Sequence, residues 1–421
     1  MYRNPGGPSM TARSLRAHAG ADICQPMGTW RRCGIIPWVV VMSTACTTEF
    51  PAYQGPSCVT DCDAGRSDAS VQVGQTTFTA WINGLVPGPE GTASVALTGT
   101  LRVRDGYAYF SALRAGTEVE ASPEPTLVVA QASNRMRITP TRGLRARGIE
   151  ELEVVWDADA ETGVVWCLPN SGASPTASVG TATLLQASPS SDAGSGRLYG
   201  VRWPVEAQGP AEAFETATLL FEPSGWRLTD RVAGPMAGAT PGAGRAQILP
   251  DGATVLGAEP GTPTSETWEG LLGGGSGVFV AQTRGPVLAG SVPGPSGWFA
   301  VRVADRPSAP EVEGAWRAAG FRVGASGRVV PSPVEWTIEA GAFQWRPLDG
   351  EGTRAGSLQS VDADAEGASG AGHRLVLGDI GELDVLNAVF SPNRRVAVVW
   401  RSVGGQPVDG AWLAVRSAPA N

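Results

Sequence analysis

Residues 95–110 read VALTGTLRVRDGYAYF and alternate apolar with polar side chains around an Asp-Gly pair. Before the pair, Leu101 and Val103 alternate with Arg102 and Arg104. Successive side chains of a β-strand point to opposite faces, so this alternation predicts a strand with one buried face. An Asp-Gly pair between two such segments is the strongest short-range signal for a two-residue turn. The stretch therefore predicts an antiparallel β-hairpin.

The hairpin pattern recurs twice further along the chain. Residues 334–345 alternate around Ala340-Gly341, and residues 218–228 alternate around Ser224-Gly225. A tryptophan precedes each of the three turn glycines at nearly the same distance. These tryptophans are Trp81, Trp203 and Trp316.

The ends of the copies also match. The second copy ends on WFAVR at 298–302, the third on WLAVR at 412–416, and the nearest equivalent in the first is VVW at 164–166. We therefore predict three tandem repeats, with a Ser-, Pro- and Gly-rich linker after the first. The repeats span 71–170, 197–305 and 310–418, and the linker spans 171–196.

The pattern of the whole body predicts an all-β protein. Each repeat contains several short alternating segments bounded by glycine and proline, and no stretch keeps a helical period for more than two turns. The repeat length is too long for a propeller blade or a solenoid turn. It suits an antiparallel β-barrel or β-sandwich repeated three times. A single β-propeller is the alternative interpretation.

A leader precedes the body. Arg31-Arg32 is followed by an apolar run at 34–42 and by Ser43-Thr44-Ala45-Cys46. A basic start, a short apolar run and small residues before a cleavage point are typical of a secretory signal, and the run is too short for a membrane-spanning helix. Ser43-Thr44-Ala45-Cys46 resembles the lipobox of bacterial lipoproteins, although Ser43 stands where leucine is commonest. The resemblance implies that residues 1–45 are removed and that Cys46 carries lipid. An ordinary signal with Cys46 unmodified is the alternative.

The sequence also supports predictions for the residues before and after the leader. A signal begins close to its basic part, so we expect Met27 to be the true start and residues 1–26 to lie upstream of it. A twin-arginine signal is the alternative. After Cys46, residues 46–70 are small, polar and acidic. Such a composition cannot bury a core, so it predicts a flexible tether between anchor and body. An ordered N-terminal loop is the alternative.

Composition excludes several classes of function. The chain has a net charge of −8 and contains no lysine, so all 32 of its Lys/Arg cations are arginines. A Walker A lysine, a kinase lysine and a pyridoxal-phosphate lysine are therefore excluded. Acidic chains repel phosphate backbones, which disfavours nucleic-acid binding. His373 is the one histidine after the leader, so a histidine-rich zinc site is excluded. We expect no cofactor.

The remaining cysteines agree with export. Cys58 and Cys62 could close a small disulfide loop in an oxidising compartment. Cys167 would then be unpaired. It lies between Trp166 and Leu168, which favours a small buried hydrophobe over a reactive thiol.

Two acidic segments resemble part of a calcium loop. Asp362, Asp364 and Glu366 stand at alternate positions before a glycine, as calcium ligands do. The position of the bidentate glutamate is occupied by His373, which is a poor ligand for a hard cation. Residues 157–161, DADAE, lack both the glycine and the glutamate. We interpret both segments as acidic turns, with calcium binding as the lesser alternative.

Tryptophan is the other candidate ligand-binding residue type. Two of the 14 tryptophans, Trp30 and Trp38, lie in the leader, and most of the others recur at matching repeat positions inside alternating strands, which predicts core packing. Trp268 lies in the loop-like segment ETWEG at 266–270 and is predicted to be exposed. An exposed indole could stack on a sugar ring, so Trp268 is the candidate for glycan binding.

These patterns favour an exported, lipid-anchored protein of a Gram-negative cell envelope, at the outer membrane or cell surface, with a non-enzymatic binding or structural role. Its expected partners are the membrane, through the anchor, and a glycan or an envelope protein. A soluble periplasmic or secreted protein is the alternative location. The alternative function is a secreted carbohydrate-active enzyme with a carboxylate pair, or a glycan-binding protein with exposed tryptophans. The sequence singles out no catalytic residue.

Overall fold

The structure is a computed structural model that describes most residues from 76 to 418. All described strands belong to one compact unit, Ala69–Asn421, which therefore contains its own core. The residues outside the description are 1–75, 89–93, 121–122, 170–178, 187–196, 204–213, 223–224, 234–242, 249–252, 259–266, 274–276, 285–296, 303–308, 325–328, 349–351, 358, 362–373, 382–383, 404–405 and 419–421.

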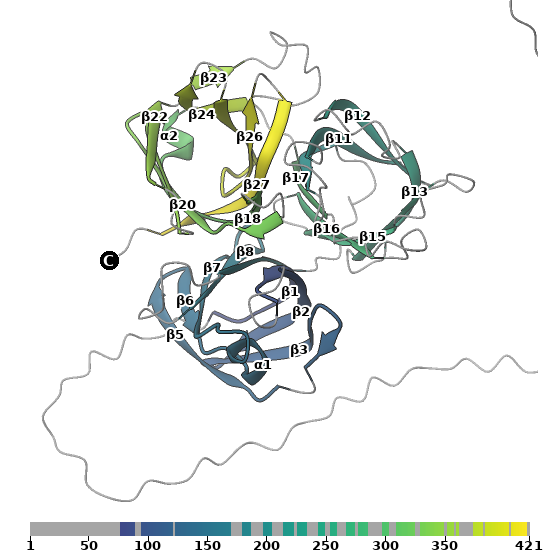
Figure 1. The fold of residues 1–421 in the computed structure, drawn as a ribbon, viewed down its shortest axis with the longest axis vertical. Helices are drawn as coiled ribbons and strands as arrows, with labels where there is room; N and C mark the ends of the chain where they lie inside the picture. The colour runs from purple at the N-terminus through teal and green to yellow at the C-terminus, as the bar shows by residue number, and fades with distance from the viewer. Residues whose placement is uncertain are drawn as a thin grey trace, which may run out of the picture. The chain divides into compact units, whose positions relative to one another are not determined.

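The described residues form three antiparallel sheets, one for each predicted repeat (Figure 1). In each sheet the first strand pairs with the last strand, which is how an up-and-down barrel closes. The prediction of tandem all-β barrels is therefore confirmed, and the propeller alternative is wrong because no sheet is arranged as a set of blades.

Barrel 1 closes through the pairs β1–β9 and β2–β3, and β4 is a short extra strand on β3. Its elements are β1 (Phe78–Val86), β2 (Val95–Arg104), β3 (Tyr107–Ala115), β4 (Glu118–Val119), β5 (Thr126–Ala132), β6 (Arg135–Ile138), α1 (Arg142–Arg145), β7 (Glu151–Asp157), β8 (Thr162–Leu168) and β9 (Gly180–Leu185).

The end of barrel 1 differs from the prediction. Strand β9 lies inside the expected linker at 171–196, and the expected terminal segment at 164–166 belongs to β8, the strand before it. All six residues of β9 are buried, so no apolar–polar alternation marks the strand. A short run of small buried residues among serine, proline and glycine gives no periodic signal, so the sequence pattern did not predict strand β9.

Barrel 2 is a closed ring of eight strands. They are β10 (Arg197–Trp203), β11 (Glu215–Glu222), β12 (Gly225–Ala233), β13 (Ala243–Ile248), β14 (Ala253–Ala258), β15 (Thr267–Gly273), β16 (Val278–Arg284) and β17 (Gly297–Arg302).

Barrel 3 has the strand order β22-β21-β20-β18-β27-β26-β25-β24-β23, with β19 also paired to β18. The hydrogen-bonded path therefore ends at β22 and β23, which are neighbours in sequence. Its elements are α2 (Ala309–Val312), β18 (Gly314–Val323), β19 (Val329–Pro331), β20 (Val334–Glu339), β21 (Ala342–Pro347), β22 (Arg354–Ser357), β23 (Gln359–Val361), β24 (Arg374–Gly381), β25 (Asp384–Phe390), β26 (Val396–Val403) and β27 (Gln406–Ser417).

The repeated hairpin occurs in all three barrels. Asp105 and Gly106 both have positive φ, 53° and 79°, and Ala340 and Gly341 have φ of 49° and 78°. Two positive values define the type I′ turn, which matches the twist of the flanking strands. In barrel 2 the pairing Glu222↔Gly225 places the glycine in β12 and not in the turn, which corrects its predicted position.

A glycine in the first strand of each barrel permits the closure. A Cβ on Gly84 would lie 2.1 Å from the carbonyl oxygen of Thr181 in β9. A Cβ on Gly200 would lie 2.2 Å from an oxygen of β17, and one on Gly320 would lie 2.3 Å from an oxygen of β27. Side chains cannot approach a backbone so closely, so each closing pair of strands requires glycine at this point.

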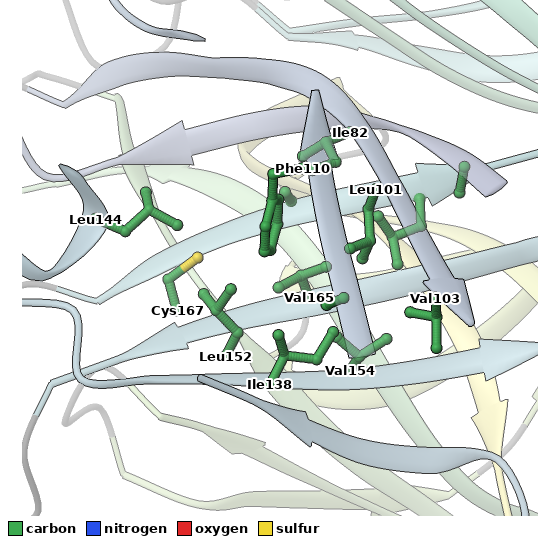
Figure 2. Packing of buried hydrophobic residues seen from close by; sticks show 14 of the residues in the cluster. Ile82, Leu101, Val103, Phe110, Ile138, Leu144, Leu152, Val154, Val165 and Cys167 are labelled. Carbon is green, nitrogen blue, oxygen red and sulfur yellow. The ribbon is translucent and has the colours of Figure 1, made fainter. Parts of the chain in front are cut away.

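The barrel interiors are filled by apolar side chains, as Figure 2 shows for barrel 1. Barrel 2 is packed around three buried tryptophans and barrel 3 around four. These side chains are Trp226, Trp268 and Trp298 in barrel 2, and Trp316, Trp336, Trp345 and Trp412 in barrel 3, all at most 4% exposed. The prediction that tryptophans at repeated strand positions pack in the core is confirmed for these residues.

Apolar side chains on the outer surfaces of the barrels form a shared core. Phe299 of barrel 2 stacks on Phe321 of barrel 3, with ring centroids 5.6 Å apart. Trp166 of barrel 1 donates a hydrogen bond of 2.8 Å from Nε1 to the carbonyl of Ala318 in barrel 3. The three barrels are therefore held together by buried contacts.

Candidate functional site

The described cavities inside the barrels are too small for a ligand. The cavity in barrel 1 has a volume of about 10 Å³ and is lined by Leu101, Phe110, Cys167 and other apolar side chains (Figure 2). A cavity in barrel 3, beside Trp345 and Trp412, has a volume of about 20 Å³. One water needs roughly 10–15 Å³ and a ligand pocket roughly 300–1,000 Å³. Neither of these two cavities therefore has room for a ligand.

A polar cleft of about 460 Å³ opens where barrel 1 meets barrel 3. Barrel 1 contributes the end of β7 and the turn between β5 and β6, and barrel 3 contributes the turn before β26 and the end of β27. Its volume lies within the range of ligand pockets. Whether the cleft can bind a ligand depends on whether its charged side chains already have partners within the protein.

The acidic segment 157–161 binds an arginine in this cleft. Asp157 is 3% exposed. Its Oδ1 accepts a hydrogen bond of 2.8 Å from the backbone N–H of Ala160, and its Oδ2 accepts one of 3.0 Å from Arg395. The same guanidinium lies 3.0 Å from Asp159. The hydrogen bond and charge of Asp157 raise the pKa of Arg395.

The uncharged side chains of the cleft also connect the two barrels. Asn134 donates a hydrogen bond of 3.0 Å to the carbonyl of Arg416, and its Oδ1 accepts one of 2.8 Å from the N–H of Ala418. The polar groups of the cleft therefore hold barrel 1 and barrel 3 together. Among the described residues no group of three or more His, Cys, Asp or Glu side chains could hold a metal ion.

Trp268 is buried, which corrects the prediction that it is exposed. Its side chain is 1% exposed and packs edge-to-face on Trp226, with centroids 5.4 Å apart. The glycine in the segment 266–270 favours a loop, but Gly270 lies within β15. A Cβ there would lie 2.7 Å from the carbonyl oxygen of Val280, so the glycine serves strand packing. Trp268 cannot stack on a sugar ring in this structure.

Cys167 is buried and free, as predicted. Burial raises the pKa of its thiol to about 12, so the nucleophilic thiolate is scarce at neutral pH. The other predicted site residues lie outside the described residues. They are Cys46, Cys58, Cys62, Asp362, Asp364, Glu366 and His373.

An exposed apolar surface lies on the outside of barrel 1. All exposed large hydrophobic side chains of the described residues belong to three strands of this barrel, β3, β4 and β5. Their exposed fractions are 47% for Tyr107, 41% for Tyr109, 58% for Val119, 54% for Leu127 and 51% for Val129. Val119 is paired with Arg114 at the far end of β3, whereas Leu127 is paired with Tyr107 at its start, so we call Tyr107, Tyr109, Leu127 and Val129 the tyrosine face.

Arginines border the tyrosine face. Arg104 is paired across the strands with Tyr107, and Arg102 is paired with Tyr109. Tyr107 is in turn paired with Leu127 on β5. Such directly opposed residues have neighbouring side chains, so the face combines apolar and cationic groups. The sequence signal for this face is that residues 107–110, YAYF, are apolar or aromatic at every position, so the outward positions of this strand are not polar.

The described part of the chain contains no helix that is long and apolar enough to cross a membrane.

Comparisons with known proteins identify no family. No family model matches the chain, and no curated protein matches it. Among solved structures, a protein of unknown function from the DUF3598 family of Nostoc punctiforme is 12% identical, with 54% of this chain and 97% of that chain covered and a TM-score of 0.20. A double mutant of transferrin binding protein B from Haemophilus parasuis is 9% identical, with 81% and 75% covered and a TM-score of 0.25. Kievitone hydratase from Nectria haematococca is 10% identical, with 81% and 90% covered and a TM-score of 0.21. These scores are too low to assign a shared fold or function.

Proposed function

We propose that this protein is a lipid-anchored, non-enzymatic binding protein of a Gram-negative cell envelope. The observation that carries the proposal is the contrast between the filled interior of barrel 1 and the tyrosine face outside it. A barrel that carries a small ligand keeps an internal cavity. This barrel instead places exposed apolar side chains on its outer surface, as protein and membrane interaction sites do.

The location rests on the leader. Arg31-Arg32, the apolar run at 34–42 and the small residues before Cys46 support export and lipid attachment. A lipid chain on Cys46 would hold the barrels at a membrane surface. Stable anchoring needs two signals, such as two acyl chains or one chain with a second membrane contact.

The competing function, a carbohydrate-active enzyme, needs a carboxylate pair that is free to act on a glycosidic bond. In the cleft, Asp157 and Asp159 are both bound by Arg395. This arrangement favours the structural interpretation of the cleft. Incubation with a panel of bacterial and plant polysaccharides should therefore leave the polysaccharides intact, and release of reducing ends would support the enzyme.

Metabolic labelling tests the anchor. The full chain is produced in a Gram-negative host with radioactive palmitate, beside the variants Cys46→Ser and, as the matched control, Cys58→Ser. We expect label in the parent and in Cys58→Ser and none in Cys46→Ser, with the labelled protein in the membrane fraction. An unlabelled parent protein would refute the lipid anchor.

A further inference from the structure

The repeated hairpin provides an internal comparison for the tyrosine face. In barrel 1 the inward residues Leu101, Val103, Ala108 and Phe110 belong to the core. The equivalent inward residues of barrel 3 are Trp336, Ile338, Phe343 and Trp345, and those of barrel 2 are Leu219, Phe221, Trp226 and Leu228. The pairing registers are the same in all three, with two residues between the strands. The inward side of the hairpin is therefore determined by packing.

The outward side of the same hairpin differs between barrels. In barrel 1 the outward residues are Arg102, Arg104, Tyr107 and Tyr109. In barrel 3 they are Thr337, Glu339, Ala342 and Gln344, all exposed. In barrel 2 they are Leu220, Glu222, Gly225 and Arg227, and here Arg227 lies 3.0 Å from Glu222 in an ion pair. Barrels 2 and 3 fold without outward tyrosines, so folding alone does not explain those of barrel 1.

The strand that pairs with the second strand of the hairpin, β5 in barrel 1 and β22 in barrel 3, shows the same contrast. On β5 of barrel 1 the exposed residues are Leu127 and Val129. On β22 of barrel 3 the exposed residues are Ala355 and Ser357, and Ser357 occupies the place of Leu127 because it is paired with Ala342. The apolar character of barrel 1 therefore extends across neighbouring strands.

The arginines of the face determine which partner it fits. Arg104 lies 2.9 Å from Asp105, so its charge is partly neutralised. Arg102, which is paired with Tyr109, has no carboxylate partner among the described residues. In a chain whose net charge is −8, this surface is both apolar and cationic. Its complement is therefore an anionic, amphipathic surface.

We propose that the tyrosine face of barrel 1 lies on the anionic headgroup layer of the membrane that holds the Cys46 anchor. Tyrosine suits this boundary because its ring is apolar and its hydroxyl can remain in water. Arginine extends its aliphatic stem along the apolar surface while its guanidinium meets the headgroup phosphates. The proposal rests on the proposed function, which supplies the anchor.

The chain length between the anchor and barrel 1 supports this partner. Cys46 precedes Thr76, the first described residue, and the predicted tether lies between them. A flexible chain of this length has an end-to-end distance of roughly 30 Å. Barrel 1 is therefore held close to the membrane, and tethering gives even a weak contact a high effective concentration.

Vesicle flotation with the unit Ala69–Asn421 tests the face without the anchor, because this unit contains all described strands. The vesicles contain phosphatidylethanolamine and phosphatidylglycerol, with phosphatidylcholine vesicles as the neutral comparison. The parent protein should float with the anionic vesicles, less so at high salt, and only weakly with the neutral ones. Salt weakens the contact because it screens the arginine charges.

The variant transplants the outward residues of barrel 3 onto barrel 1: Arg102→Thr, Arg104→Glu, Tyr107→Ala and Tyr109→Gln. The matched control makes Thr337→Ala and Gln344→Ala on the equivalent hairpin. We expect the transplant to lower vesicle partitioning at least ten-fold and the control to leave it unchanged. Arg102→Gln alone should lower it about five-fold, the effect of one arginine near an anionic surface. Circular dichroism and the Tm verify that each variant is folded.

Equal partitioning of the transplant and the parent would overturn the proposal, and so would a folded parent protein that does not float with anionic vesicles. The anchor is judged separately by palmitate labelling of Cys46 in the full chain. If the protein floats but is not labelled, the proposal for the tyrosine face stands and the proposal for the lipid anchor is refuted. If the protein is labelled but does not float, the proposal for the anchor stands and the proposal for the face is refuted.

Discussion

The guanidinium of Arg317 lies against the carboxylate of Glu153, which joins the first strand of barrel 3 to β7 of barrel 1. Both side chains are buried, with 5% and 6% of their surface exposed. The guanidinium also lies 4.2 Å from the centroid of the Trp166 ring, and Arg135 is a second partner of Glu153. Burial lowers the pKa of Arg317 from its ordinary value, and the charge of Glu153 opposes that change.

Removal of Arg317 should destabilise the protein strongly. Its loss removes the most buried partner of Glu153 and the contact with the Trp166 ring, while Arg135 remains as a partner of Glu153, so the cost should be about 2–3 kcal/mol. We expect Arg317→Met to lower the urea midpoint accordingly. Arg227→Ala is the control, because Arg227 and Glu222 are both about half exposed and such pairs contribute about 1 kcal/mol or less. Equal effects of the two substitutions would contradict the role given to the buried pair.

Glycine at the barrel closure should be irreplaceable. Gly200→Ala forces a Cβ against the backbone of β17, and overpacking of this kind costs about 1–3 kcal/mol or more. Gly257, also in a strand of barrel 2, has no atom within 4 Å of the position that a Cβ would occupy, so Gly257→Ala should change the free energy of unfolding by about 0.5 kcal/mol at most. Thermal unfolding of both variants measures the difference, and equal Tm values would argue against a close strand approach.

The side chain of Trp268 should contribute to the free energy of unfolding. Its burial predicts that Trp268→Ala lowers the free energy of unfolding by about 3–5 kcal/mol. Its Nε1 has no hydrogen-bond partner in the described structure, so Trp268→Phe removes no hydrogen bond and should cost less than Trp268→Ala. Urea unfolding of the two variants tests this order. A stable Trp268→Ala protein would indicate that the side chain is exposed after all.

The Cys167 thiol should be inert in the native protein and should make stability depend on alkaline pH. Its pKa is raised to about 12 by burial, so the native state retains a proton that the unfolded state loses above its pKa of 9.0. This contribution to stability is present below pH 9.0 and is lost as the pH rises towards 12. From pH 8 to pH 10 the parent should lose about 1 kcal/mol more than Cys167→Ala in urea unfolding. An equal loss in both proteins would contradict this thiol as the cause.

Much of the fold was predictable because the hairpin signal depends on local chemistry. The Asp105-Gly106 turn needs two positive φ angles, and the alternation of Leu101 and Val103 with arginines marks the inward face. Both features depend only on residues that are neighbours in the sequence, so the sequence pattern is enough to predict them. Strand β9 was not predictable in the same way, because it is buried on both sides and so has no alternation.

The site was harder to predict than the fold. The partner of Asp157 is Arg395, which is distant in sequence, so the acidic segment looked like a free turn. Trp268 looked exposed because Gly270 resembled a turn glycine, while the glycine in fact permits close packing on β16. The tyrosine face became visible once the register paired Tyr107 with Leu127 on another strand.

The most direct measurement is fluorescence quenching in the anchored full chain. A fluorophore is attached to Tyr109→Cys or to Gln344→Cys, its equivalent in barrel 3, with Cys58 and Cys62 replaced by serine in both proteins. The buried Cys167 does not compete for the label. The proteins are inserted through their lipid into vesicles that contain brominated anionic lipids, which quench nearby fluorophores. If barrel 1 lies on the membrane, the label at position 109 is quenched much more than the label at position 344. Equal quenching at the two positions would contradict the claim that the tyrosine face of barrel 1 lies on the membrane.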